Sequence, residues 1–317
     1  MSLFDFLRNS ICSLQLPCVG IILSNKAGFL RGLMKKWFLV LFLTFTCALE
    51  ALPLGNPAET ALFSENILFS SSFCELVNIG LRAGYYGDFV FDRKLHLREN
   101  RHIARDLIKT EISTNAGYLV LNLCDRHDIF CTLGATRISI EADQQVWREA
   151  PTAFAKNSFL TLKPGFSWSI GGRTVLYENA GFILGVEGQY FAAYPVIHKY
   201  QMFTFANPHY LHGEATYREG QLGAVLSYEI DTFSPDFSAI PYIGVKWARA
   251  TLTSHNFTFN ADTFEGFVPF TIFNTESVLS LGCPIGVTLL LNQSIDFTLE
   301  GRFGDEIAFS LFIQALF

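Results

Sequence analysis

Three neighbouring residues, Asp125, His127 and Asp128, form the one dense group of side chains in the sequence that could perform acid–base chemistry. Carboxylates beside an imidazole can act as general acid and general base. The group lies between two segments of alternating polarity, however, and we expect His127 and Asp128 to form a tight turn whose side chains are solvated. The sequence also lacks the Gly-x-Ser-x-Gly turn that presents a serine nucleophile. We therefore expect neither an enzymatic activity nor a cofactor.

Cysteines are the second reactive group. Those downstream of residue 51 are Cys74, Cys124, Cys131 and Cys283. A two-residue turn at 127–128 would place Cys124 directly opposite Cys131 on adjacent strands, close enough for a disulfide. Two reduced, small apolar side chains are the alternative at this pair. Cys and His do not show the spacing of a zinc site, so no metal site is expected.

Charged residues recur at positions that alternate with apolar ones. A charged side chain facing lipid costs about 2–4 kcal/mol for Arg or Lys at the membrane midplane, so these residues belong on an inner face. The pore-lining candidates are Arg82, Asp88, Asp92, Arg173, Glu187, Glu219, Glu229, Lys246, Asp296, Glu300 and Arg302. In a wide barrel they would line a water-filled channel, and their acidic excess would favour cations. In a ten-strand barrel they could instead pack into a closed, salt-bridged interior, and both arrangements stay open.

The elements that would position these side chains are strands, because apolar and polar residues alternate with a period of two over long segments. Outward-facing residues are then expected at Val77, Leu81, Tyr85, Phe89, Phe297, Leu299, Ile307, Phe309, Leu311, Ile313 and Phe317. A soluble sandwich also alternates, but its strands are shorter. The length of these segments predicts an all-β fold, an antiparallel transmembrane outer-membrane β-barrel.

The composition is consistent with a closed barrel in a lipid membrane. Apolar residues make up 50% of the 317-residue chain, charged residues only 16%, and the formal net charge is −6. Soluble domains carry about 25% charged residues. The acidic balance excludes a basic nucleic-acid binder, and the apolar content excludes a disordered chain. The sequence also has no run of roughly 18 uncharged apolar residues, which a spanning helix would need.

Ten strands can be traced from the alternation. They are expected near 75–92, 113–126, 129–141, 159–178, 180–195, 214–230, 238–253, 276–291, 294–303 and 306–317. Tight links alternate with long ones, as short periplasmic turns alternate with long extracellular loops in bacterial barrels. The long links 142–163 and 254–275 could each contain a further hairpin. The strand number is therefore expected to be even, at least 10 and up to 12–16.

The beginning of the chain reads as an export signal. Two lysines at 35–36 precede the apolar stretch 37–45, and small residues at 48 and 51 offer a cleavage point. We expect residues 1–33 to be an upstream extension, 34–51 a cleaved signal peptide, 52–74 an N-terminal periplasmic segment and 75–317 a single barrel domain. A long, unusual leader is the alternative for the first 51 residues.

Several segments resemble the chlamydial major outer membrane protein, a porin family. LPLGNPAE (52–59) is similar to its mature N-terminus and GYYGDFVFDR (84–93) to its first strand. LNLCDRHDIFCTLGAT (121–136), FSWSIGGRTVLYENA (166–180) and PYIGVKWARA (241–250) are similar to later strands. The chain is shorter than members of that family, so it resembles a shortened paralogue.

The resemblance implies an outer-membrane porin that lets small hydrophilic solutes and ions diffuse passively. It also implies contact with outer-membrane lipid, a candidate homotrimer, and disulfide links between envelope proteins through Cys74. A different class of function stays open. The barrel could be a surface structural or adhesive protein that anchors loops without an open pore, and strand number would separate the two because lumen width grows with it.

Overall fold

A computed structural model of the chain describes residues 54–62, 79–98, 107–143, 157–202, 208–230, 237–255, 257–263, 266–291 and 294–316. All of these residues lie in one compact unit, Ala48–Phe317. The expected extension at 1–33, the signal peptide at 34–51 and Cys74 lie outside the described residues.

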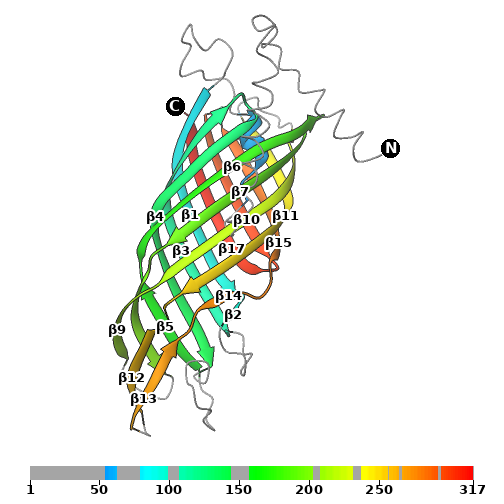
Figure 1. The fold of residues 1–317 in the computed structure, drawn as a ribbon. Helices are drawn as coiled ribbons and strands as arrows, with labels where there is room; N and C mark the ends of the chain where they lie inside the picture. The colour runs from blue at the N-terminus through cyan, green and yellow to red at the C-terminus, as the bar shows by residue number, and fades with distance from the viewer. Residues whose placement is uncertain are drawn as a thin grey trace, which may run out of the picture. The chain divides into compact units, whose positions relative to one another are not determined.

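Ten long strands form a closed antiparallel barrel (Figure 1). They are β1 (Ile79–Arg93), β3 (Lys109–Leu123), β4 (His127–Asp143), β6 (Gly165–Asn179), β7 (Phe182–Ala193), β10 (Thr216–Tyr228), β11 (Phe237–Thr253), β15 (Leu281–Leu291), β16 (Ile295–Phe303) and β17 (Glu306–Leu316). Their order around the wall is β3-β1-β17-β16-β15-β11-β10-β7-β6-β4, and pairing of β3 with β4 closes the ring. The antiparallel barrel is confirmed, and its ten strands equal the lower bound of the expected strand number.

The two ends of the barrel differ in their connections. Short connections, with at most eight residues between consecutive strands, join β3 to β4, β6 to β7, β10 to β11 and β15 to β16 at one end, which we call the short-turn end. The last residues of β17 pair with β1 at this same end, where Arg82 lies opposite Leu316. We call the other end the long-loop end, because most of its connections carry additional strands.

Additional strands extend the wall at the long-loop end. They are β2 (Leu95–Leu97), β5 (Asn157–Lys163), β8 (Val196–Met202), β9 (His209–Glu214), β12 (Phe257–Thr263), β13 (Gly266–Ile272) and β14 (Thr275–Ser277). β12 and β13 pair as a separate hairpin, so the hairpin expected within 254–275 is present. β5 pairs with β4 and β8 instead of forming a second hairpin within the described part of 142–163. No described helix is long and apolar enough to cross a membrane.

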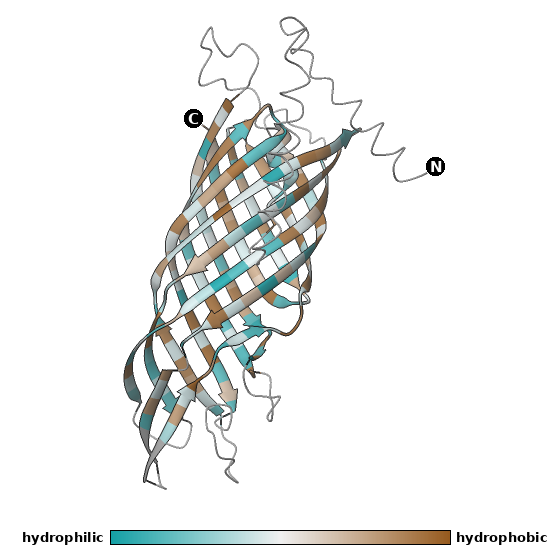
Figure 2. Ribbon diagram, viewed as in Figure 1, coloured by the Kyte–Doolittle hydropathy of each residue, from teal (hydrophilic) through white to brown (hydrophobic). Residues whose placement is uncertain are grey.

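Alternation along each strand separates an outer from an inner face (Figure 2). On β1, Leu81 and Tyr85 are each 41% exposed and Phe89 is 37% exposed, whereas the intervening Arg82 and Asp88 are buried. The same holds on β16 and β17, where Ile307, Phe309 and Ile313 are exposed. Phe297, Leu299 and Leu311 share that face and are half-buried. The outward phase is thus as expected, with Val77 and Phe317 outside the described residues.

A β-bulge reverses this phase at the end of β1. The register shifts between Val90 and Asp92, so that Asp92 lies opposite the exposed Ile307 and Arg93 lies opposite the buried Glu306. A bulge adds one residue to a strand and exchanges the faces beyond it. The expectation that Asp92 faces inward is therefore wrong, and Arg93 takes that place.

The turn between β3 and β4 also differs from expectation. It consists of residues 124–126, with Leu123 opposite His127, so Cys131 pairs with Leu119 and not with Cys124. Cys124 and Asp125 adopt left-handed backbone angles in this turn, with φ of 55° and 57°. Cys124 is an exposed free thiol and Cys131 a half-buried one. The directly opposed cysteine pair predicted from a two-residue turn is wrong.

Candidate functional site in the barrel lumen

The inner face of the barrel is unusually rich in buried charge. Its buried acidic side chains are Glu59, Asp88, Asp128, Glu187, Glu219, Asp296, Glu300, Asp305 and Glu306. Its buried basic side chains are Arg82, Arg93, Arg173, Lys246 and Arg302. Charges removed from water require partners, so the arrangement of these side chains determines what the lumen can do.

Nine of the eleven side chains predicted to line a pore lie inside the barrel. They are Arg82, Asp88, Arg173, Glu187, Glu219, Lys246, Asp296, Glu300 and Arg302, each buried. Asp92 lies on the outer phase beyond the bulge. Glu229 follows the end of β10 at the short-turn end, where it is half-exposed and accepts a 3.4 Å hydrogen bond from Ser238.

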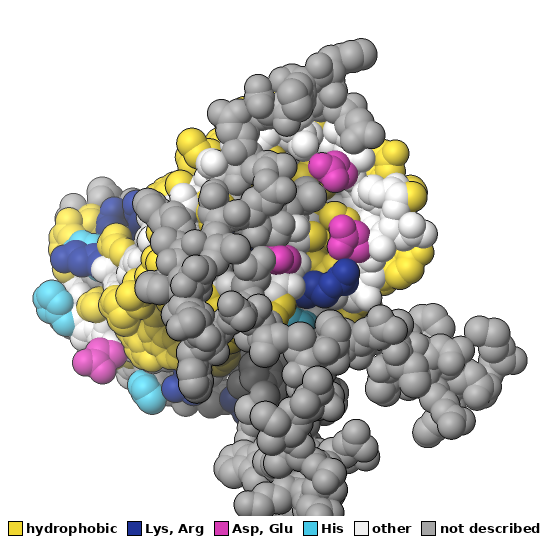
Figure 3. All heavy atoms as spheres, turned by 90° about the horizontal axis from the view of Figure 1, so that it is seen from above, with side chains coloured by type: hydrophobic (Ala, Val, Ile, Leu, Met, Phe, Trp, Pro, Cys, Tyr) yellow, Lys and Arg dark blue, Asp and Glu magenta, His cyan; other side chains and the backbone are white. Residues whose placement is uncertain are grey.

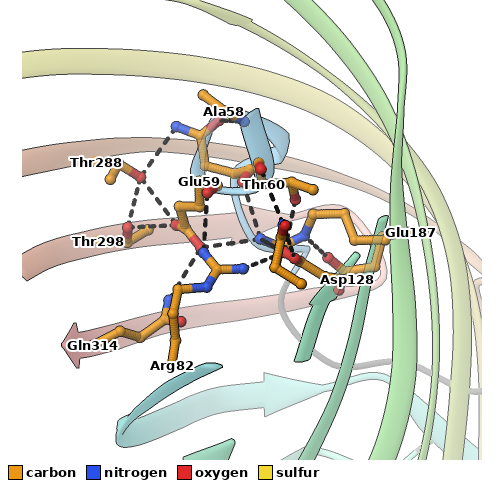
Figure 4. Close-up of polar contacts among 12 residues, drawn as sticks. Ala58, Glu59, Thr60, Arg82, Asp128, Glu187, Thr288, Thr298 and Gln314 are labelled. Carbon is orange, nitrogen blue, oxygen red and sulfur yellow. Dashed lines mark hydrogen bonds and ion pairs between the residues drawn. The ribbon is translucent and has the colours of Figure 1, made fainter. Parts of the chain in front are cut away.

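A short N-terminal segment fills the short-turn half of the lumen. Residues 54–62 include helix α3 (Pro57–Leu62), whose Glu59 and Thr60 point at side chains of the wall inside the barrel (Figure 4). Leu54, Asn56 and Thr60 are fully buried. Asn56 caps the helix, because its Oδ1 accepts a 3.0 Å hydrogen bond from the Ala58 amide. Pro57 follows at the first helical position, where its missing N–H costs nothing. We call residues 54–62 the plug segment.

Glu59 is the main anchor of the plug segment. One carboxylate oxygen accepts hydrogen bonds from Thr298 Oγ1 at 2.8 Å and Thr288 Oγ1 at 3.2 Å. The other accepts from Arg173 Nη1 at 3.0 Å and from Gln314 Nε2 at 3.1 Å. The buried carboxylate is thus bonded to side chains from four strands of the wall.

Arg173 joins the plug segment to the wall. Its Nε donates to Glu187 Oε2 at 2.6 Å, and its Nη1 donates to the Asn56 carbonyl oxygen at 3.0 Å as well as to Glu59. Asn56 in turn donates to the Ile240 carbonyl oxygen at 3.2 Å. One guanidinium therefore satisfies one carboxylate of the wall and two groups of the plug segment.

Asp128 makes a second connection. It accepts hydrogen bonds from Arg82, from Thr60 Oγ1 at 2.7 Å and from Asn122 Nδ2 at 2.8 Å. Arg82 also donates to the Glu59 carbonyl oxygen at 3.0 Å. Asp128 was expected to be a solvated turn residue. The turn ends at residue 126, however, so Asp128 is the second residue of β4 and lies on its buried inner face.

A second ionic cluster lies towards the long-loop end. Glu306 accepts hydrogen bonds from Lys246, from Arg302 Nε at 2.5 Å and from Arg93 Nη1 at 3.1 Å. Its other members pair at 2.6–2.9 Å: Arg302 with Asp88, Arg93 with Asp305, and Arg93 with Glu219. The three cations and their carboxylates cross-link β1, β10, β11, β16 and β17 from within.

Aromatic side chains fill the space between the two ionic layers. The rings of Tyr86 and Tyr118 lie 5.1 and 5.8 Å from that of Phe312, and Tyr118 lies 5.6 Å from Phe130. The cavity beside them measures about 10 Å³, roughly the space of one water molecule. Viewed from above in Figure 3, acidic and basic side chains lie close together within a border of hydrophobic ones. The described part of the lumen around these rings is therefore closely packed, as in the closed, salt-bridged interior of the two arrangements considered.

Several lumen residues were missed from the sequence. Glu59 and Asn56 precede the first strand and have no alternation to mark them, while Asp305 and Glu306 lie at the β16–β17 link. Arg93 was hidden by the bulge. The signal that could have found Asp128 is the parity of β4, on which it shares a face with Phe130 and Thr132, both buried.

The sequence of the chain is similar to those of known outer-membrane proteins. The family described as Chlamydia major outer membrane protein matches residues 30–104 and 94–158. A major outer membrane porin of Chlamydia pneumoniae is 29% identical, over 66% of this chain and 72% of that protein. The serovar L1 major outer membrane porin of Chlamydia trachomatis is 28% identical, over 87% of this chain and 86% of that protein. This chain is related to the chlamydial major outer membrane proteins.

The resemblance stated from five sequence blocks is thereby confirmed, and the outer membrane is the location of the chain. In barrels of that membrane short turns face the periplasm, so the short-turn end is the periplasmic end. Among solved structures, the outer membrane protease OmpT from Escherichia coli is 10% identical with a TM-score of 0.39, over 80% of this chain and 98% of OmpT.

Proposed function

We propose that the chain is an outer-membrane porin that allows small hydrophilic solutes and ions to diffuse passively. The observation that carries the proposal is the inner face of the barrel, where charged and polar side chains replace an apolar core, in a relative of proteins named major outer membrane porins. The packed lumen implies that conduction requires side chains and the plug segment to move. The proposal includes no cofactor and no covalent step.

The Asp125–His127–Asp128 group supports a non-enzymatic role. Asp128 is bonded to Arg82, while His127 is exposed and its Nδ1 lies 3.1 Å from Thr174 Oγ1. The group therefore lacks a free buried carboxylate that could orient the imidazole towards a nucleophile.

Ion selectivity should follow the acidic excess of the lumen. Nine buried carboxyl groups face five buried cations, so the interior attracts cations once water enters. Current across a planar bilayer containing the full mature protein tests the proposal, and reversal potential in a KCl gradient gives the selectivity. We expect measurable current with a modest cation preference that falls as salt rises. A clear anion preference would mean that the loops control the pore.

One observation favours a second function. Among the described residues, the ten-strand lumen is closely packed between the plug segment and the second ionic cluster, as in narrow barrels that are filled by their interior side chains. The chain would then be a surface structural or adhesive barrel, with links to other envelope proteins through Cys74. Absence of current in every variant described below would select this function. A homotrimer remains a prediction, which cross-linking of the purified protein tests.

A further inference from the structure

The wall of the barrel is complete without the plug segment. Backbone ladders between β1 and β17, and between β3 and β4, close the ring entirely from strand residues. The plug segment adds no strand to this sheet and is joined to it by side-chain contacts and a few bonds to backbone carbonyls. It can therefore leave without breaking the hydrogen-bond ladders of the wall.

The wall is shaped to receive the plug segment. A Cβ built on Gly185 would lie 2.3 Å from Pro57 Cβ, and one built on Gly223 would lie 2.2 Å from Leu54 Cδ1. Atoms cannot approach this closely, so the segment occupies space that exists only because these two wall positions are glycine. Leu54 packs on Val225 and Tyr242 beside this hollow.

Charges in the wall keep partners when the plug segment leaves. Arg173 retains Glu187, Arg82 retains Asp128, and Thr288 and Thr298 retain the 2.6 Å hydrogen bond between their hydroxyl groups. Glu59 would return to water, where its charge is solvated. Displacement therefore leaves no wall cation without a carboxylate, which avoids the large penalty of an unpaired buried charge.

We propose that the periplasmic half of the lumen is a peptide-binding site and that the chain's own residues 54–62 occupy it as a displaceable plug. The peptide is recognised by an acidic side chain, Glu59, and by an amide side chain, Asn56, within one helical turn. Regulation of flow by this plug rests on the proposed porin function, whereas occupation of the site does not. The two claims can be tested by separate measurements.

Accessibility of the lumen tests the plug. Ser169 is buried on the inner face of β6, four residues beyond Arg173 towards the long-loop end, and it accepts a 2.9 Å hydrogen bond from Gln189. Ser169→Cys, in a full chain whose native cysteines are replaced by serine, reports entry of a water-soluble thiol reagent from the periplasmic side. Adding Asn56→Ala with Glu59→Ala removes the two polar anchors. We expect labelling at least about tenfold faster, since several buried hydrogen bonds are lost.

The matched control is Glu111→Ala in the same reporter chain. Glu111 is exposed and pairs with Lys109 at 2.5 Å, so the change removes an acidic side chain without touching the lumen. Its labelling rate should equal that of the parent. Equal rates for the anchor variant and this control would overturn the plug.

A disulfide lock tests the same point without weakening the fold. A Cβ on Gly223 would lie 2.9 Å from Leu54 Cγ, close to the ~3 Å between a Cβ and the far sulfur of a disulfide. Leu54→Cys with Gly223→Cys should form a disulfide that links the plug segment to β10. While this disulfide is intact, labelling of the Ser169→Cys reporter should be slow. Reduction of the disulfide should restore the labelling rate. Failure to cross-link in the folded barrel would overturn the docked position.

Ionic current across a planar bilayer distinguishes the docked plug from the proposed porin function. If the anchor variant increases current and the oxidised lock abolishes it reversibly, both the plug and the porin function are supported. If labelling responds to both variants but no chain conducts, the plug stands and the porin function fails.

Discussion

Leu54 of the plug segment packs against Gly223 of the barrel wall, in the space that a side chain at position 223 would fill. The leucine Cδ1 lies 2.2 Å from the position that a glycine Cβ would take, and Leu54 itself is fully buried. The contact joins β10 to a segment that ends well before the first strand of the barrel begins. The stabilising effect of the docked plug segment can therefore be measured with a substitution in the wall alone.

Gly223→Ala should therefore destabilise the protein, by about 1–3 kcal/mol, through overpacking against Leu54. Combining it with Leu54→Ala should remove most of this penalty, because the smaller side chain leaves room for the new methyl group. Guanidinium unfolding of the barrel in lipid vesicles, followed by tryptophan fluorescence, measures the four free energies of this cycle. Additive effects of the two changes would show that the residues do not touch.

Arg173→Met should be strongly destabilising, by about 3–5 kcal/mol, because Glu187 is left buried without its cation. Arg173→Met with Glu187→Met should recover part of that loss, since neither charge then remains. The same unfolding measurement applies. Arg249→Met is the control, as Arg249 is largely exposed in its 3.2 Å pair with Glu276, and it should have a much smaller effect.

Glu306→Gln should destabilise the long-loop half of the lumen. The carboxylate serves Arg93, Lys246 and Arg302 together, and a neutral amide would leave an excess of buried positive charge. We expect a loss of about 3–5 kcal/mol, with the plug-dependent labelling of the Ser169→Cys reporter unchanged. A simultaneous change in that labelling would mean that the two ionic layers act as one unit.

Leu133→Arg should reduce stability by about 2–4 kcal/mol, because the leucine lies on the lipid-facing side of β4 near its middle. Leu133→Phe is the matched control and should be close to neutral, since the outer face accepts any large apolar side chain. Unfolding from vesicles measures both. Equal stability of the arginine variant would place this face of β4 outside the lipid.

Cys124 and Cys131 should differ in reactivity. Cys124 is exposed in the turn, whereas Cys131 lies half-buried on the lipid-facing side of β4. A charged thiol reagent added to the native barrel should modify Cys124 rapidly and Cys131 slowly, as peptide mass spectrometry can show. An internal Cys124–Cys131 disulfide after mild oxidation would contradict the observed register.

The fold was predictable because a period of two is visible in every long strand. Leu81, Tyr85 and Phe89 face lipid and Arg82 and Asp88 face inward, as the polarity of each residue requires. Counting these segments also gave the lower bound of ten strands, which is the number that the barrel contains. Each of these properties depends only on neighbours along the chain.

The site was less predictable, because it depends on register and on distant contacts. A single bulge at Phe91 places Arg93 on the inner face, where Asp92 was expected. The turn before β4 lies a few residues earlier than expected, so Asp128 belongs to the strand and faces the lumen. The role of Glu59 could not be read locally, since its partners Thr288, Thr298 and Gln314 follow more than two hundred residues later. Six residues of helix give no periodicity that would show a buried face.

The contacts of Glu59 also fix an order of assembly. Its carboxylate bonds Thr298 and Gln314, which lie 239 and 255 residues further along the chain, so the docking surface does not exist until β16 and β17 have joined the sheet. Contacts of such long sequence separation form late in folding. The plug segment, which is synthesised before every strand of the barrel, therefore docks last. A protease that cuts the free segment would distinguish unfinished barrels from finished ones.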